Sequence, residues 1–231
     1  MVSSHPETWL RLETAAVGAS LHMAIDEVVL ETASQRDQVA LRLYHWSEQA
    51  ATFGYFQRYA AVKAWTTLRP LIRRPTGGGL VLHQGDWTYS LVFPPRHPWY
   101  GLAATESYRQ LHRWLAGALS ALGLKAELVP SARPGLEGRC FSNPARFDVV
   151  YQGMKIAGAA QRRNRQGLLI QGSVQPPPGL ESANWPESIC GEASRQFGVQ
   201  WRIQPLDPTL TQCAEALADA KYRQGEFSRR R

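Results

Sequence analysis

The 231-residue sequence predicts an α+β protein formed by one domain, because strand patterns outnumber helix patterns and often follow one another directly. A regular βαβ arrangement would place a helix between successive strands. We find no internal repeat and no linker long enough to separate two domains. Hydrophobic residues make up 44% of the chain and charged residues 19%, as in an ordinary globular protein with its own core. We therefore expect one domain over residues 1–231.

The helices are predicted from apolar residues at helical spacing. In Ser20–Ala33 the apolar positions recur every three or four residues, and Asp26 and Glu27 fall on the wetter side, where they would stabilise the helix. A long pattern ends at Gly123, a typical C-terminal cap. The predicted helices cover residues 20–33, 63–67, 105–122 and, after Ala193, a returning helical pattern that is clearest over Leu210–Tyr222.

The strands are predicted from alternation and from β-branched and aromatic residues. They cover residues 40–46, 51–57 (a short strand or a turn), 71–74, 86–93, 126–129, 147–151, 154–157 and 168–174. Gln152-Gly153 is a plausible hairpin turn between two of them. The run Arg162–Arg165 is interpreted as a solvated loop, or as a docking patch for an acidic partner.

The run from Arg73 to His83 contains three consecutive glycines after two arginines, with an apolar triplet before the histidine. Glycine is unfavourable inside a helix or strand, and it is used where the backbone approaches a ligand or has a positive φ. The run lacks the P-loop and Rossmann spacings. It is either a hairpin turn or a backbone platform for a ligand with an anionic head and an apolar tail. His83 is either a structural residue or a pocket residue, and Asp86 either caps a turn or holds an arginine.

The composition excludes several classes of protein. No window reaches 18 apolar residues, and charges near the N-terminus argue against a signal peptide, so we expect a cytoplasmic protein without a membrane partner. Three cysteines without CxxC spacing make a disulfide framework or a structural metal site improbable. The net charge of +7 favours an acidic partner, but no nucleic-acid signature accompanies it.

Two residues are candidates for chemistry. Lys155 lies on a mostly apolar strand before Gly158-Ala159-Ala160, where it either reaches solvent or points into a pocket at a carbonyl or phosphate oxygen. Cys140 follows a turn-rich segment and is either a nucleophile or a small buried residue. Cys190 and Cys213 have no such setting and are interpreted as structural.

Five segments in order resemble the lipoate–protein ligase and octanoyltransferase family of the biotin/lipoyl protein ligase superfamily. They are residues 22–27, 41–46, 54–57, 73–86 and 155–162, within about two thirds of the chain. The segment with Cys140, Pro144, Phe147 and Asp148 resembles the cysteine-bearing part of the octanoyltransferases related to the ligases. The biotin ligases of this superfamily carry a glycine–arginine loop that is absent here, which disfavours biotin.

This resemblance implies a mixed, largely antiparallel sheet flanked by helices, with the acyl chain in a tunnel beside the glycine run. It implies Cys140 as the nucleophile and Lys155 as the group that orients the acyl carbonyl. The implied acyl-binding residues are Arg74, Thr76, Gly77, Gly78, Gly79, His83, Gly158 and Ala159.

The implied reaction moves an octanoyl group from acyl carrier protein, through a cysteine thioester and without a cofactor, to a lysine of an apo-lipoyl domain or glycine-cleavage H protein. The first alternative is an ATP- and Mg-dependent lipoate–protein ligase, and the second is a non-catalytic lipoyl- or acyl-binding paralogue. Two departures favour the second alternative: Ala159 where the family commonly has serine, and Gln171 where relatives often have histidine. We expect no accessory C-terminal domain, which fits a transferase better than a complete ligase.

Overall fold

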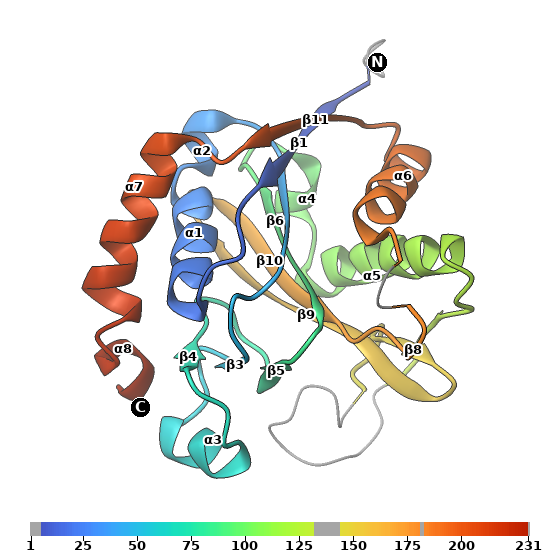
Figure 1. Cartoon of the computed structure of the whole chain (residues 1–231). Helices are drawn as coiled ribbons and strands as arrows, with labels where there is room; N and C mark the ends of the chain where they lie inside the picture. The colour runs from blue at the N-terminus through green and yellow to red at the C-terminus, as the bar shows by residue number, and fades with distance from the viewer. Residues whose placement is uncertain (1–5, 132–143, 181–182, 231) are drawn as a thin grey trace.

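A computed structural model describes residues 6–131, 144–180 and 183–230, and an eight-stranded sheet runs through its centre (Figure 1). The strand order is β11-β1-β2-β6-β10-β9-β8-β7. The neighbours β11-β1-β2 are parallel and the other neighbours are antiparallel, which confirms the mixed, largely antiparallel sheet. The strands are β1 (Thr8–Glu13), β2 (Ala40–Tyr44), β6 (Trp87–Phe93), β7 (Glu127–Leu128), β8 (Val149–Tyr151), β9 (Met154–Asn164), β10 (Gly167–Val174) and β11 (Gln200–Pro205).

A second, smaller sheet lies below one end of the large sheet in Figure 1 and has the order β4-β3-β5. Its strands are β3 (Ala50–Phe53), β4 (Leu71–Arg73) and β5 (Val81–His83). The glycine run forms the connection between β4 and β5, so its predicted position beside strands is confirmed.

Helices cover both faces of the large sheet, on opposite sides in Figure 1. On one face α1 (Ala19–Glu31) packs against β6, β10 and α7 (Pro208–Leu217). On the other face α5 (Ala104–Ala121) packs against β8, β9 and α6 (Trp185–Phe197). The remaining helices are α2 (Ala33–Arg36), α3 (Tyr59–Trp65), α4 (Pro98–Gly101), the π-helix η1 (Ala218–Tyr222) and α8 (Glu226–Arg229).

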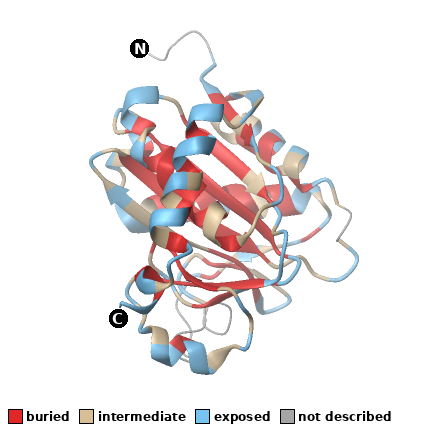
Figure 2. Ribbon diagram, turned by 60° about the vertical axis from the view of Figure 1, so that its left-hand side comes forward, coloured by how far each residue is buried: buried red, intermediate tan, exposed pale blue. Residues whose placement is uncertain are grey.

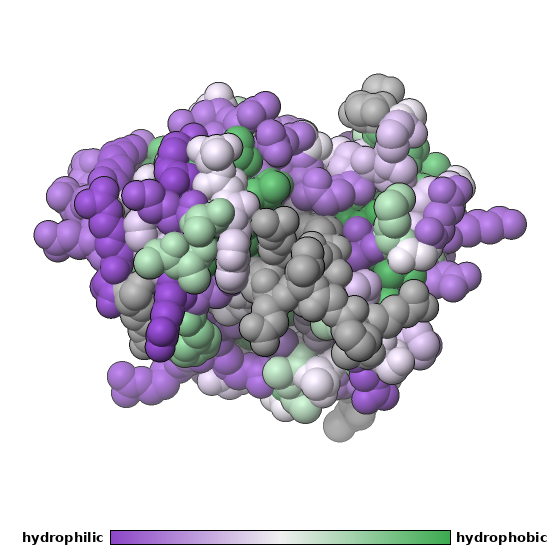
Figure 3. Space-filling model, turned by 90° about the horizontal axis from the view of Figure 1, so that it is seen from below, coloured by the Kyte–Doolittle hydropathy of each residue, from purple (hydrophilic) through white to green (hydrophobic). Residues whose placement is uncertain are grey.

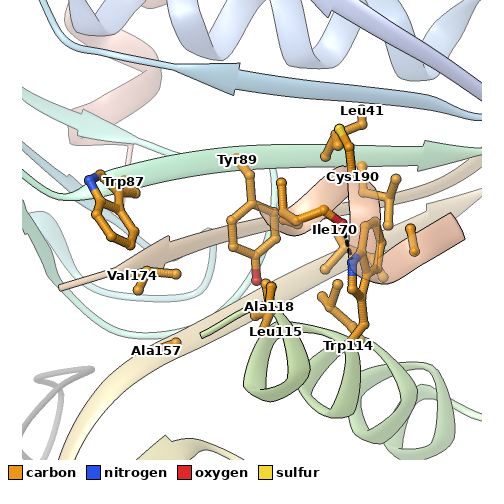
Figure 4. Packing of buried hydrophobic residues seen from close by; sticks show 14 of the residues in the cluster. Leu41, Trp87, Tyr89, Trp114, Leu115, Ala118, Ala157, Ile170, Val174 and Cys190 are labelled. Atoms are coloured by element: carbon orange, nitrogen blue, oxygen red, sulfur yellow. Dashed lines mark hydrogen bonds between the residues drawn. The ribbon is translucent and has the colours of Figure 1, made fainter. Parts of the chain in front are cut away.

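Two hydrophobic cores, one on each face, follow from this layering, and the buried strands between them form the red centre of Figure 2. β6 and β10 are buried at every position. Figure 4 shows the α5–α6 side, where Tyr89, Ile170 and Trp114 belong to one cluster. The Trp114 indole donates to the Ile189 carbonyl at 2.7 Å. Cys190 belongs to the same cluster.

Several sequence predictions about local structure are wrong. β1 and β11 were not predicted; β11 is an edge strand with mostly exposed side chains, so it shows no apolar alternation. β9 continues through Asn164, so most of the arginine-rich run is paired strand rather than loop. Asp26 and Glu27 are buried at 0% and 6% exposure, and both take part in polar clusters instead of facing water.

The C-terminal segment is bound to the small sheet by one buried arginine. The Arg73 guanidinium, 0% exposed, donates to the carbonyls of Phe227 and Ser228 and to those of Tyr55 and Gln57. Glu27 adds a second attachment, because it accepts from Lys221 and from the Tyr222 hydroxyl. The C-terminal helices are therefore tied to the segment beside the glycine run.

The surface viewed from below is shown in Figure 3, where hydrophilic side chains dominate on the side of α7 and α8. Phe56, which is 75% exposed, lies two residues after Gly54 and is the most exposed of the large hydrophobic side chains that the structure describes. Among the described helices, none combines the length and the apolar character that crossing a bilayer requires.

Candidate functional site

A narrow pocket lies between the two sheets, and the space in it that the centre of a water-sized sphere can reach is about 30 Å³. Strands β2, β6, β9 and β10 of the large sheet contribute one wall, and β3, β5 and the glycine run contribute the other. Its lining residues are Met23, Tyr44, Trp46, Thr52, Arg74, Gly78, Val81, His83, Thr88, Gly158, Ala159, Ala160, Gln171, Gly172 and Ser173. The mixture of apolar groups with a few polar ones in this lining is typical of a site for a small molecule.

The glycine run is shaped by the side chain of Arg74. One guanidinium nitrogen donates to the Gly77 carbonyl at 3.0 Å and to the Gly79 carbonyl at 2.8 Å, which curves the backbone around it. Gly78 has φ +85°, a conformation that favours glycine. A methyl group on Gly54 would lie 1.9 Å from the Gly78 carbonyl oxygen, so this close approach of the two backbone segments requires glycine at position 54.

His83 lies in a chain of hydrogen bonds along the pocket wall. Its Nδ1 contacts Asp86 Oδ2 at 2.9 Å, and its Nε2 contacts Thr52 Oγ1 at 2.7 Å, which in turn accepts from Arg74 at 2.8 Å. Burial lowers the pKa of His83, so the ring is neutral. A neutral ring donates from Nδ1 to the carboxylate and accepts at Nε2 from the threonine hydroxyl. The Trp46 ring stacks on it, with 3.8 Å between ring centres.

A second polar cluster is centred on the Asp26 carboxylate. Arg42 forms a buried ion pair with it, the Ser90 hydroxyl donates at 2.5 Å, and the Tyr44 hydroxyl donates at 3.1 Å. His22 packs against this cluster, and burial together with the Arg42 charge lowers the pKa of His22 to about 3. The cluster therefore fixes α1 and β2 relative to the pocket.

Lys155 lies behind the wall of the pocket and forms a buried ion pair. Its Nζ is 2.7 Å from Asp148 Oδ2, and the two side chains are 4% and 0% exposed. Asp148 also accepts from the Tyr108 hydroxyl and from the Ala145 amide. A methyl group on Gly158 would lie 2.7 Å from Cε and 2.8 Å from Nζ of Lys155, so the lysine fills the space that a side chain at this lining position would need.

The predicted site residues fall into three groups. Arg74, Gly78, His83, Gly158 and Ala159 line the pocket, while Gly77 and Gly79 shape its roof through their carbonyls. Thr76 and Lys155 contact lining residues from behind. Cys140 falls in 132–143, outside the described residues.

The other two cysteines are unsuited to nucleophilic chemistry at this pocket. Cys190 is buried in the α5–α6 core, and burial raises the pKa of its thiol to about 11. Cys213 is exposed on α7, which packs on α1 rather than on the pocket strands.

Sequence reasoning named five of the fifteen lining residues as site residues and missed the other ten. The aromatic wall of Tyr44 and Trp46 lies in a segment that resembles the family but contains no predicted site residue. Gln171 was identified only as a position at which the chain differs from its relatives. Tyr108 and Asp148, which hold Lys155, are separated from each other by 40 positions, and no local pattern joins them. Among the residues that the structure describes, no cluster of histidine, cysteine, aspartate and glutamate is arranged to hold a metal ion.

The sequence that forms the glycine run, the β9 strand with Lys155 and the pocket matches a known family. Residues 19–176 match the model for the lipoyl protein ligase A/B catalytic domain. The chain belongs to this family. The match includes α1, the small sheet and every residue that lines the pocket.

Proteins named octanoyltransferase LipM are similar in sequence. The one from Kyrpidia tusciae is 38% identical over 184 residues, and the one from Brevibacillus brevis is 32% identical over 184 residues. Each alignment covers 73% of this chain and 66% of the relative, so the chain matches slightly less than two thirds of the length of these relatives.

Solved structures share the fold. A lipoate-protein ligase A bound with ATP has a TM-score of 0.74 at 21% identity, and the similarity covers 96% of this chain and 98% of the other. A putative lipoate protein ligase from T. acidophilum with bound lipoic acid has a TM-score of 0.76 at 22% identity, covering 97% and 100%. These similarities confirm the predicted architecture.

Proposed function

We propose that the protein is an octanoyltransferase. It takes an octanoyl group from acyl carrier protein and passes it to the ε-amine of a lysine on an apo-lipoyl domain or glycine-cleavage H protein, without a cofactor. The relatives named octanoyltransferase LipM support this reaction over ligation. The main support for the proposal is the pocket, because its lining residue Gly158 lies against the amine of Lys155.

The octanoyl chain occupies the pocket between the aromatic wall and the glycine run. Arg74 and His83 are engaged with the protein, so they shape this space rather than bind a free carboxylate. The acyl carbonyl lies at the Gly158 edge, where the Lys155 ammonium stabilises the negative charge that develops on its oxygen. Asp148 keeps this ammonium in place.

Cys140 is the nucleophile in this proposal. Its thiolate attacks the thioester of the acyl carrier, the carrier thiolate leaves and takes up a proton, and an octanoyl–cysteine thioester remains. The acceptor amine then attacks this thioester, loses a proton, and releases the Cys140 thiolate. Exchange between two thioesters needs no ATP, because the acyl group stays activated throughout.

The test is intact-protein mass spectrometry after mixing with octanoyl-acyl carrier protein in the absence of ATP. We expect an octanoyl adduct in the wild type and in Cys213→Ser, a control that removes an exposed thiol, and no adduct in Cys140→Ser. Addition of an apo-lipoyl domain then discharges the adduct. Lipoylation that requires ATP and survives Cys140→Ser would show a ligase instead. Acyl binding without turnover under either condition would show a non-catalytic paralogue.

A further inference from the structure

The side chain of Gln171 joins two parts of the pocket that lie far apart in sequence. Its Nε2 donates to Asp26 Oδ2 on α1 at 2.7 Å, and its Oε1 accepts from the Thr76 hydroxyl at 2.7 Å. Gln171 is 5% exposed and Thr76 is 1% exposed. Both hydrogen bonds are therefore shielded from water, where the loss of a partner is costly.

The chemistry of the partners fixes the direction of this bridge. An ionised carboxylate only accepts, so the amide nitrogen of Gln171 must face Asp26, and its oxygen must face Thr76. The Thr76 hydroxyl is thereby required to donate. Asp26 is an immobile anchor for the bridge, because Arg42 and Ser90 hold its other oxygen.

Thr76 connects this bridge to the backbone beside the pocket. Its carbonyl accepts from the Tyr55 amide at 2.8 Å, and the next residues are the glycines of the roof. Glycines have little conformational preference of their own, so their position depends on what holds the ends of the run. Arg74 fixes the carbonyls within the run, and Thr76 is its attachment to the large sheet.

We propose that Gln171 is a positioning residue, which holds the glycine run over the pocket by attaching Thr76 to the Asp26–Arg42 ion pair. The effect on acyl binding rests on the function proposed above, whereas the effect on the position of the run does not. The neutral amide suits this role, because a group that gains a proton would change which atoms donate.

The charged and titratable groups around this bridge come from several elements. They are His22 and Asp26 on α1, Arg42 and Tyr44 on β2, Arg74 after β4, His83 on β5 and Asp86 before β6. Burial lowers the pKa of both His22 and His83, so neither histidine carries a charge at neutral pH. A histidine at position 171 would introduce a proton-binding group into this setting.

The first test is hydrogen–deuterium exchange of the protein without ligand, read at the Tyr55 amide. Gln171→Met keeps the length of the side chain and removes both hydrogen bonds, and we expect the protection factor of Tyr55 to fall about tenfold. Thr76→Val gives the same loss, and Thr76→Ser, which keeps the hydroxyl, restores protection. Gln110→Met, the same change on α5, leaves Tyr55 unaffected. Unchanged protection in both Gln171→Met and Thr76→Val would overturn the proposal.

The second test uses Gln171→His. Above the pKa of the new imidazole one nitrogen donates to Asp26 and the other accepts from Thr76, but the protonated ring has only donors. We expect the Tyr55 protection factor of this variant to match that of the wild type at pH 8 and to fall once the pH is below the pKa of the new imidazole. A protection factor at pH 8 as low as that of Gln171→Met would contradict the directional bridge, because the neutral ring still supplies one donor and one acceptor.

The kinetic test separates positioning from the proposed function. With octanoyl-acyl carrier protein as donor, Gln171→Met should raise KM about tenfold with a smaller change in kcat, and the control Gln110→Met should behave as the wild type. A change confined to kcat would contradict the placement of the run over the acyl chain. If the wild type transfers no octanoyl group, the proposed function fails, and the exchange experiments still decide whether Gln171 holds the run.

Discussion

Gly158→Ala moves the Lys155 amine without removing it. The added methyl carbon would lie 2.7 Å from Cε and 2.8 Å from Nζ, whereas ordinary contact begins at 3.4 Å. The end of the side chain must therefore shift by 0.7 Å, the difference between 3.4 and 2.7. Displacements of about 1 Å in a catalytic group lower rates about 100-fold. We therefore expect kcat for octanoyl transfer to fall about 10- to 100-fold.

The stability of this variant should change little, because the atoms that give way are the far end of one flexible side chain. We expect a loss of about 1 kcal/mol or less in the free energy of unfolding, measured by urea denaturation. A double-mutant cycle with Lys155→Met decides the cause, since the methyl group should have no further effect once the amine is absent. Additive losses would show that the methyl group obstructs the pocket directly. An unchanged rate in Gly158→Ala would refute the role assigned to the amine.

Three further predictions concern stability. Gly54→Ala places a methyl group 1.9 Å from the Gly78 carbonyl oxygen, backbone against backbone, so urea denaturation should show a loss of about 3 kcal/mol, and an unperturbed midpoint would contradict this contact. Asp148→Asn removes the carboxylate from the buried ion pair with Lys155 and should lower the free energy of unfolding by about 3 kcal/mol. Asp219→Asn, in an exposed ion pair, should lower it by less than about 1 kcal/mol, and equal losses would argue against a buried pair. Burial lowers the pKa of His112 from 6.5 to about 3, so the unfolded chain binds a proton that the folded chain does not, and stability falls as pH falls through this window. His112→Phe should remove about 1.4 kcal/mol per pH unit from that slope, measured as unfolding free energies at pH 5.5 and 4.5, between the two pKa values; an identical slope in both proteins would refute it.

The elements with clear local signals were predictable. β6 and β10 are buried throughout, so their β-branched and aromatic composition is direct evidence of a central strand. α5 has one apolar face and a glycine after its end, and its predicted bounds agree with the structure to within a residue. β11 gave no signal, because its side chains face water at the sheet edge and it is a strand only through pairing with β1.

The polar part of the site was less predictable than its apolar part. Asp26 was interpreted from its spacing as a helix residue that faces water, but the donors that make its burial tolerable come from β2, β6 and β10. The glycine run was interpreted as either a hairpin turn or a backbone platform, and the direction of Arg74 toward its carbonyls, which is set by geometry within the loop, had no signal in the sequence. Patterns along the chain report which faces are buried, whereas these hydrogen bonds depend on strand register.

The attachment of Arg73 to the last helix limits how the chain can be shortened. A fragment that ended at residue 176, where the family match ends, would lack Phe227 and Ser228 and would leave a guanidinium inside the protein without two of its acceptors. It would also lack β11, and thereby expose the edge of β1. The smallest stable unit of this protein is consequently larger than the segment by which its family is recognised.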